Sequence, residues 1–535
     1  MIHRQPRPST SAKLTRRGFL SLAPAMSLFG QAPELPRTFL FLDWQHVNKG
    51  DLEATLDPAR VTGDGRKLLE MYARDFKKVF DETGHGFRPR NMPSGVRIAL
   101  ERPEKSEPWL MPDQPWERSI SNVSVIQEEG RYRCWYDAVL RKTERTVASA
   151  EGRVVEVTGS AMAYAESADG FHWTKPAKRM LSHAGSLENN LVSTYNNGGE
   201  VFRDDHGPAE ERYKVFSFAE LPKETLKPNA TSRDRYGLYG VSSPDGYRWT
   251  RNPKPLIRYF ADTSNIADWD PALRKYVGFF RNHLGGRSIS FAETEDFWNW
   301  PEPRPILHPS SLDGPADDYY TNGYMRYPDD QSLRLLFAAI YHHDSDLVDV
   351  RLGTSRDGRA FQWASYEPII PNGPTGRWDA GSVYAHRSLV RLPGGRLALP
   401  LLGYSGTHNG AWFRNFYGTD NGAGQVGWAI WKDARLGGIE AASQGEFSTI
   451  AARFDGSSIR INARTTAAGA VQVELASGGK PIDGFTFADA VAFHGDEVWT
   501  DLRWRGNQDI RALRGKNIEL RVRLRAAKIF AYRFA

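Results

Sequence analysis

The chain has 535 residues, of which 40% are hydrophobic, 25% charged and 12% aromatic. Its 16 Trp, 21 Tyr and 27 Phe exclude a disordered chain, and its one cysteine, Cys134, excludes a scaffold held by disulfides. The formal charge is +6, but residues 1–32 hold five basic residues and no acid, and subtracting these five leaves +1 for the remainder. A folded body so close to neutral is not expected to bind nucleic acid.

The first 32 residues resemble a twin-arginine export signal. Arg16 and Arg17 precede an apolar stretch at 19–29, and residues 30–32, Gly-Gln-Ala, offer a small-residue cleavage site. This route exports a folded protein, so we expect a periplasmic or secreted location. The alternative is a disordered basic tail with a chance arginine pair. No uncharged apolar run is long enough for a membrane span, which needs roughly 18–20 residues.

Residues 33–110 are expected to pack on the main body as an N-terminal segment. It begins with a strand at 39–42 and contains the one helix predicted in the chain, over 65–83. Apolar side chains recur there at helical spacing, at Leu68, Leu69, Tyr72, Phe76, Val79 and Phe80.

A short motif repeats through the middle of the chain. The pattern Ser-x-Asp-Gly-x-x-Trp occurs at 167–173 and 243–249, returns as 355–358 with Trp363, and has a degenerate copy at 295–300. Each copy follows a short strand-like run, and Asp-Gly favours a tight turn between strands. We interpret the motif as a structural turn on the outer part of each repeat.

A second hairpin accompanies each repeat. These hairpins are predicted at 122–136, 201–218, 265–281, 322–341 and 382–404. Five units of two hairpins predict a five-bladed β-propeller over 111–438, which an N-terminal strand closes against 426–431.

Residues 439–535 have a different sequence pattern from the repeats. Segments at 459–462, 471–475 and 518–524 alternate apolar and polar residues with period two, and Gly and Asp turns separate them. This alternation predicts a C-terminal antiparallel β-sandwich, so the whole fold is expected to be all-β apart from the one helix.

Five two-hairpin units followed by a sandwich resemble the five-bladed propeller glycoside hydrolases of families 32 and 43. The similarity is clearest at 164–173, 239–249 and 457–466. The family 32 signature Asn-Asp-Pro-Asn-Gly is absent, and Asp205 stands where an Arg-Asp-Pro motif would have proline, so no role is carried to Asp204. The resemblance implies a carbohydrate substrate, hydrolysis by two carboxyl groups, and no cofactor.

In the hydrolases that the chain resembles, the reactive carboxylates lie where each innermost strand begins, around an axial funnel. One carboxyl group must be protonated and the other ionised, and crowded acids raise each other's pKa. The rule gives the catalytic candidates Glu117, Asp262, Asp318, Asp43 and Asp379. The substrate-binding candidates are Trp116, Asn122, Asn265, Arg281, His283, Asn322, His343 and His408. The same rule places Glu200 and Asp137 near the funnel without giving them a role.

Each candidate has a structural alternative. Glu117 could form a surface ion pair, Asp262 an Asx turn, Asp318 a solvated loop, and Asp43 a cap after a strand. A metal site is not expected, because the adjacent residues His342 and His343 would point to opposite faces of a strand. Two other functions stay open: a non-catalytic carbohydrate-binding propeller, and a lyase that uses His283 or His343 with Arg281.

Overall fold

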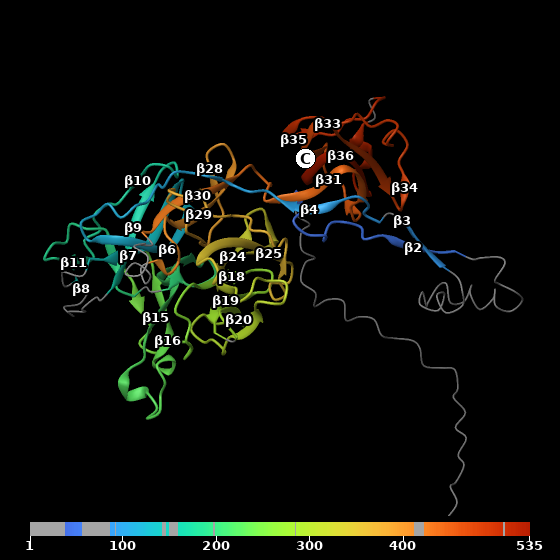
Figure 1. Cartoon of the computed structure of the whole chain (residues 1–535). Helices are drawn as coiled ribbons and strands as arrows, with labels where there is room; N and C mark the ends of the chain where they lie inside the picture. Colours follow the sequence, from blue (N-terminus) through green and yellow to red (C-terminus); the bar gives the residue numbers. More distant parts are fainter. Residues whose placement is uncertain are drawn as a thin grey trace, which may run out of the picture. The chain divides into compact units, whose positions relative to one another are not determined.

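The computed structural model describes residues 38–55, 86–90, 92–141, 146–148, 159–195, 198–283, 285–410, 422–506 and 509–535. Within these ranges the regular elements are β-strands and short 3-10 helices, so the predicted all-β class is confirmed (Figure 1). The predicted export signal and the helix predicted over 65–83 lie outside the described residues. In the described part of the chain, no helix is long and apolar enough to cross a membrane.

Most strands belong to four sheets, which we divide into blades 1 to 5 in chain order; one ten-stranded sheet supplies blades 4 and 5, which are joined by a parallel bridge between Val348 and Ser382. The strands of blade 1 are β6 (Glu117–Glu128), β7 (Arg131–Leu140), β9 (Ser160–Ser167), β10 (Trp173–Thr174) and β12 (Leu191–Ser193). Those of blade 2 are β14 (Phe202–Arg203), β15 (Tyr213–Glu220), β16 (Tyr236–Ser243) and β17 (Thr250–Arg251). Before them, β13 (Gly199–Glu200) pairs in parallel with the first strand of blade 3.

The other three blades follow the same plan. Blade 3 consists of β18 (Asn265–Asp270), β19 (Lys275–Asn282), β20 (Ser288–Thr294) and β21 (Arg304–Leu307). Blade 4 consists of β22 (Asp318–Thr321), β23 (Tyr324–Tyr327), β24 (Asp330–His342), β25 (Leu347–Ser355) and β26 (Gln362–Trp363). Blade 5 consists of β27 (Ser382–Ala385), β28 (Val390–Leu392), β29 (Arg396–Tyr404), β30 (Gln425–Trp431) and β5 (Glu104–Lys105).

Hydrogen bonds join each blade to the next and close the ring. In blade order they link Ser124 Oγ to Val201 N (2.8 Å), Gly198 O to Asn265 N (2.7 Å), Ser264 O to Asn322 Nδ2 (2.7 Å), Gly381 O to Val348 N (3.3 Å) and Ile120 O to the Tyr404 hydroxyl (3.2 Å). A ring of antiparallel meanders is a propeller. Strand β5 adds to the last blade, because Lys105 pairs with Ala429 and Glu104 with Ile430, whereas the first strand, expected at 39–42, pairs instead with residues 531–533.

The repeated turn motif joins neighbouring blades by hydrogen bonds. In blade 2 the Asp245 carboxylate accepts two backbone N–H groups, and Ser243 Oγ accepts the N–H of Gly246 at 2.8 Å. The Gly246 carbonyl then accepts Nε1 of Trp249 at 3.0 Å and Nε1 of Trp135, from blade 1, at 2.7 Å. Gly246 has φ +80°, a conformation that glycine adopts readily.

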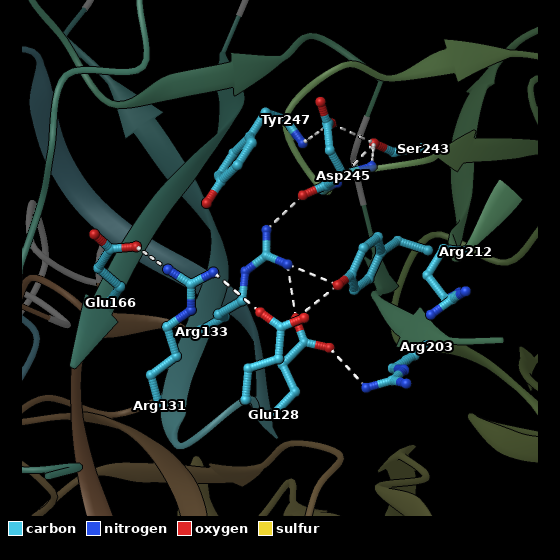
Figure 2. A network of polar contacts seen from close by, with 12 residues as sticks. Glu128, Arg131, Arg133, Glu166, Arg203, Arg212, Ser243, Asp245 and Tyr247 are labelled. Atoms are coloured by element: carbon cyan, nitrogen blue, oxygen red, sulfur yellow. Dashed lines mark hydrogen bonds and ion pairs between the residues drawn. The ribbon is translucent and has the colours of Figure 1, made fainter. Parts of the chain in front are cut away.

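A buried arginine reinforces the same junction between blades 1 and 2 (Figure 2). One nitrogen of Arg133 donates to Glu128 Oε1 and to the Tyr213 hydroxyl, both at 2.7 Å, and another donates to the Asp245 carbonyl at 2.6 Å. Arg203 binds the second oxygen of Glu128 at 3.1 Å. Because every charge here is paired, the network is structural and leaves no group free for chemistry.

The C-terminal sheet is built on two long strands, β33 (Ile459–Ser477) and β36 (Asn517–Phe534), together with β31 (Gly437–Ser448). The pairing of β33 with β36 shifts register between Thr465 and Ala470 of β33. Ala526 of β36 lies opposite this shift and has a φ of +40°. The strand halves on both sides of this irregularity contribute to one apolar core, which includes Ile461, Val473, Val522 and Ile529. The strands thus fold over a shared core as the two layers of a sandwich. The sheet also takes in β1 (Thr38–Leu40), β4 (Arg97–Leu100), β32 (Ala452–Arg453), β34 (Lys480–Pro481) and β35 (Asp496–Asp501).

Two small pairs and four turns complete the described elements. The pairs are β2 (Asp51–Thr55) with β3 (Gly86–Arg90) and β8 (Thr146–Ala148) with β11 (Leu181–His183). The 3-10 helices are η1 (Ala209–Glu211), η2 (Lys223–Thr225), η3 (Arg233–Arg235) and η4 (Ile510–Leu513).

Candidate active site

The innermost strands of the blades surround a cavity of about 260 Å³. Four of the five blades contribute to its wall, and its side chains are polar or aromatic with one exception, Leu402. The lining residues are Ser121, Asn122, Thr263, Tyr320, Thr321, Ser382, Tyr384, His386, Leu402, Tyr404, Thr407 and His408. Such a wall suits a polyol better than an apolar ligand.

Some polar atoms of this wall are buried without a hydrogen-bond partner. Among the described residues, neither Thr321 Oγ1 nor His386 Nε2 has a hydrogen-bond partner. A buried polar group that bonds to nothing is costly, so such atoms mark a place that water or a ligand fills. Both atoms are therefore available to a bound hydroxyl group.

Asp137, on β7, is a carboxyl group buried directly behind the wall and only 3% exposed. The Asn122 side-chain amide donates to its Oδ2 at 2.7 Å, and Thr263 Oγ1 in turn donates to Asn122 Oδ1 at 3.3 Å. Burial raises the pKa of Asp137 to about 7, and the nearby charge of Glu200 acts in the same direction. Asp137 therefore titrates near neutral pH and holds its proton at mildly acidic pH.

Asn122 itself stands in an irregular stretch of β6. The pairing with β7 shifts register between Ser121 and Ser124, and Asn122 has φ +43°, which is rare for a residue other than glycine. Such backbone strain is often found at functional sites. The irregularity aims the Asn122 amide at Asp137 and into the cavity wall.

Glu200 follows the first blade and is 1% exposed. Its carboxylate accepts the Ser264 hydroxyl at 2.6 Å and the Arg387 backbone N–H at 2.6 Å, and His386 Nδ1 lies 3.0 Å from it. Three partners compensate its charge in a buried position. Glu200 thus fixes the orientation of His386, whose other nitrogen faces the cavity wall without a partner.

Asp262 carries the more accessible carboxylate, with 41% of its side chain exposed. Arg281 donates to Asp262 Oδ1 at 2.7 Å and, through its other nitrogens, to the Tyr320 carbonyl at 2.8 and 3.0 Å. The Arg281 guanidinium also lies 3.9 Å from the centre of the Tyr320 ring. His283 Nε2 is 3.9 Å from the same carboxylate. Arg281 therefore connects Asp262 to Tyr320 in the cavity wall.

Asp318 is linked to the same wall residue through Arg287, whose guanidinium lies 4.9 Å from the centre of the Tyr320 ring. Arg287 donates to the Asp318 carboxylate with a side-chain nitrogen at 2.6 Å and with its backbone N–H at 2.7 Å, and His343 Nε2 is 2.9 Å away. Burial disfavours the charged form of Asp318, but these hydrogen bonds together favour it more strongly. They hold the pKa of Asp318 below its ordinary value. Asp318 is thus an ionised carboxylate committed to structural partners.

A tyrosine–histidine pair completes the wall. The Tyr384 hydroxyl lies 2.7 Å from His408 Nδ1, and the Tyr320 ring packs 4.6 Å from the His408 ring. Burial, assisted by the charge of Arg287, lowers the pKa of His408 to about 4. The imidazole is therefore neutral at physiological pH, and its Nδ1 and the Tyr384 hydroxyl share one hydrogen bond.

Several sequence candidates lie elsewhere, in contacts that stabilise the fold. Glu117 is fully buried and binds the Tyr136 hydroxyl at 2.6 Å and Lys175 Nζ at 2.7 Å. Trp116, which precedes it, faces the ring of His183 at 6.3 Å. None of these side chains lines the axial cavity.

Asp43, Asp379, Asn265 and Asn322 are also engaged in structural contacts. Asp43 binds Arg356 at 2.7 Å, and Asp379 binds Lys105 at 2.6 Å. The amides of Asn265 and Asn322 donate to backbone carbonyls and so hold neighbouring strands together. The structure thus groups Asn122, Asp262, Arg281, His283, Asp318, His343 and His408 around the cavity and its Tyr320 wall, and leaves the other six candidates outside it.

Sequence reasoning missed Asp137 and Glu200 as functional candidates and missed the tyrosines of the wall. A signal for Asp137 was present, because it is a single acid inside the apolar run Cys134–Leu140 of a buried strand. An acid in that environment must shift its pKa. In the described residues, no group of three or more His, Cys, Asp or Glu side chains is placed to hold a metal ion.

No family model matches the sequence, and no curated protein matches it. Solved structures do match, and they include a thermostable family-43 glycoside hydrolase, as the resemblance predicted; it is 12% identical with a TM-score of 0.38, over 61% of this chain and 92% of that one. A fructofuranosidase from Schwanniomyces occidentalis complexed with fructosylnystose is 10% identical with a TM-score of 0.38, over 82% and 98%. An N-acetylgalactosamine deacetylase from F. plautii in complex with blood group B trisaccharide is 14% identical with a TM-score of 0.40, over 64% and 97%. At these TM-scores, neither a function nor a residue role passes from these proteins to this chain.

Proposed function

We propose that the protein is an exported glycoside hydrolase that cleaves glycosidic bonds of a polysaccharide or oligosaccharide in the axial cavity. The observation that carries the proposal is the state of Asp137, a buried carboxyl group whose pKa is raised to about 7 beside a polar cavity. A protonated carboxyl group near neutral pH is what protonation of a leaving sugar oxygen requires.

In this proposal Asp137 is the general acid and Asp262 the ionised partner. Asp262 is accessible, and Arg281 stabilises its charge, as a base or nucleophile requires. Glu200 is the third carboxylate, and its charge adds to the effect of burial, which raises the pKa of Asp137. The two groups are suited to different roles because Asp137 is buried, whereas Asp262 is accessible and paired with Arg281.

The cavity wall supplies substrate contacts. The rings of Tyr320, Tyr384 and Tyr404 offer apolar faces for a sugar ring, while His386 Nε2 and Thr321 Oγ1 offer unpaired polar atoms for its hydroxyl groups. The resemblance of residues 1–32 to a twin-arginine export signal supports a role outside the cytoplasm, where an enzyme encounters polysaccharides.

Two single substitutions test the proposal: Asp137→Asn and Asp262→Asn. We expect turnover of a true substrate, measured as release of reducing ends across a polysaccharide panel, to fall about 10²-fold or more for Asp137→Asn and Asp262→Asn. Glu117→Gln, outside the cavity, is the matched control and should keep its activity in the folded fraction. Full activity of both Asp variants would reject this site.

One observation favours a second candidate, a polysaccharide lyase. The neutral His408 is hydrogen-bonded to the Tyr384 hydroxyl near Arg281, and a tyrosine–histidine pair with an arginine can remove a proton next to a sugar carboxylate. A lyase would release products with a new double bond and strong ultraviolet absorbance, and Tyr384→Phe would abolish them. Binding of glycans without release of any product would instead indicate a non-catalytic carbohydrate-binding propeller.

A further inference from the structure

A groove of about 650 Å³ lies on the C-terminal sheet. Its floor consists of three neighbouring strands, in the order β33, β36 and β31. Ser94 lies on one rim beside β31, and Ala492 and His494 lie on the other rim beside β33. A second hollow of about 310 Å³ continues the groove and shares Glu446 and Arg523 with it.

The alternation of β36 explains why this groove is charged. Val522 and Leu524 point into the sandwich core, so Arg521, Arg523 and Arg525 stand on the opposite face. The register places Glu446 and Gln472 on either side of Arg523, and Gln444 and Ala470 on either side of Arg525. The floor is thus a lattice of guanidinium, amide and carboxylate groups at regular spacing.

The three arginines differ in how well their charges are paired. Arg521 binds Glu474 at 3.1 Å, and Arg523 lies 3.5 Å from Glu446 while stacking 3.9 Å over the Phe487 ring. Arg525 is exposed and forms no ion pair with any described residue. The groove therefore carries one guanidinium whose charge is uncompensated.

We propose that this groove is a binding site for an acidic polysaccharide, a chain that carries uronate carboxylates. A carboxylate pairs with the Arg525 guanidinium, and the amides of Gln444 and Gln472 bind the hydroxyl groups of neighbouring sugar units. The spacing of strands in a sheet, about 4.8 Å, and of alternate residues, about 6.6 Å, provides repeated donors along an extended chain. This inference does not depend on the proposed hydrolase function.

Binding at a second place would raise the local concentration of substrate for the axial cavity. Two linked sites on one polymer bind more tightly than either site alone, without any new contact. The groove therefore acts as an anchor on an acidic polymer, whatever chemistry the propeller performs.

The test is affinity electrophoresis of the full chain in gels that contain polygalacturonate, with dextran as the neutral comparison. We expect retardation by polygalacturonate alone, weakened by salt because the contact is between exposed charges. Arg525→Gln should weaken the apparent affinity about tenfold, the loss of one charge-assisted hydrogen bond. Glu446→Gln removes the competing carboxylate and should strengthen the retardation.

Arg514→Gln is the matched control, because Arg514 is exposed on the same C-terminal unit but does not line the groove. The groove is overturned as the site if Arg514→Gln and Arg525→Gln weaken retardation equally, if Glu446→Gln has no effect, or if dextran retards the protein as strongly. Since retardation is measured without turnover, an inactive cavity would leave this result unchanged, and a failed anchor would leave the hydrolase proposal standing.

Discussion

The proton on Asp137 is set by a small number of contacts, and each can be changed separately. Burial disfavours the charged carboxylate, whereas the amide of Asn122 and the backbone N–H of Gly198 favour it. Burial prevails, so the group titrates near pH 7. The strained backbone of Asn122 is consistent with a position selected for this contact rather than for stability.

Asn122→Gly tests this contact with little backbone penalty, because glycine accepts the φ of +43°. Removing the amide donor removes a stabiliser of the charged carboxylate, so the pKa of Asp137 should rise. The alkaline limb of kcat/KM should move up by about one pH unit. Thr263→Val, which removes the other contact of Asn122, should leave the limb in place. An unchanged limb in Asn122→Gly would show that Asp137 is not the group that titrates.

The same shift predicts a pH-dependent cost in stability. The pKa of Asp137 is raised from 3.8 to about 7, so its contribution to stability is fully present below pH 3.8 and is lost as the pH rises through 7. Asp137→Asn should therefore be more stable than the wild type at pH 8, by up to about 4 kcal/mol, and should lose this advantage at acid pH. Urea unfolding at both pH values measures the difference.

Asp318→Asn is the control, because its effect on stability at pH 8 should have the opposite sign. The pKa of Asp318 is lowered, so its contribution is present above its ordinary pKa and is lost as the pH falls below it. This variant should be less stable than the wild type at pH 8. If both variants shift stability in the same direction at pH 8, burial of Asp137 does not govern its proton.

At the scale of the elements, strand β5 closes the ring through one buried ion pair. Lys105 Nζ binds Asp379 Oδ2 at 2.6 Å and also contacts the Pro371 carbonyl. Asp379 is 1% exposed, so neither charge of the pair is free to reach substrate. The pair holds a two-residue strand that would otherwise have only a few ladder hydrogen bonds.

Asp379→Asn and Lys105→Met should each lower the free energy of unfolding by about 3–5 kcal/mol, because each leaves an uncompensated buried group. The double variant should lose less than the sum of the two, since the partners share one interaction. Thermal unfolding of the four proteins measures this coupling. If Asp379→Asn lost activity but kept its stability, Asp379 would be a catalytic acid, as expected from the sequence.

The elements were more predictable than the site. Local signals mark the blades: Asp-Gly turns, period-two alternation and a tryptophan that repeats with each turn. The site depends on long-range facts. The partner of Asp379 is 274 residues away, and no spacing rule reveals it. The rule that site residues lie where an innermost strand begins also failed for β6. This strand begins at Glu117, but the residue that reaches the cavity is Asn122, which follows a register shift.

At the scale of the whole molecule, one N-terminal segment is shared by the propeller and the sandwich. Strand β1 pairs with β36 and β4 with β31 in the C-terminal sheet, whereas β5 pairs with β30 in blade 5. Neither part can lose its share of this segment without disturbing the other. The two parts are therefore expected to unfold together rather than as independent domains.

Phe41→Ala and Phe279→Ala test this coupling from the two sides. Phe41 is fully buried in the sandwich core against Phe447 and Tyr532, and Phe279 is fully buried in blade 3 against Tyr324. Each truncation should cost about 3–5 kcal/mol. In calorimetry the wild type should give one transition, and either variant should shift all of it to lower temperature. Two transitions, of which Phe41→Ala moves one and Phe279→Ala the other, would show that the shared segment does not make the propeller and the sandwich a single cooperative unit.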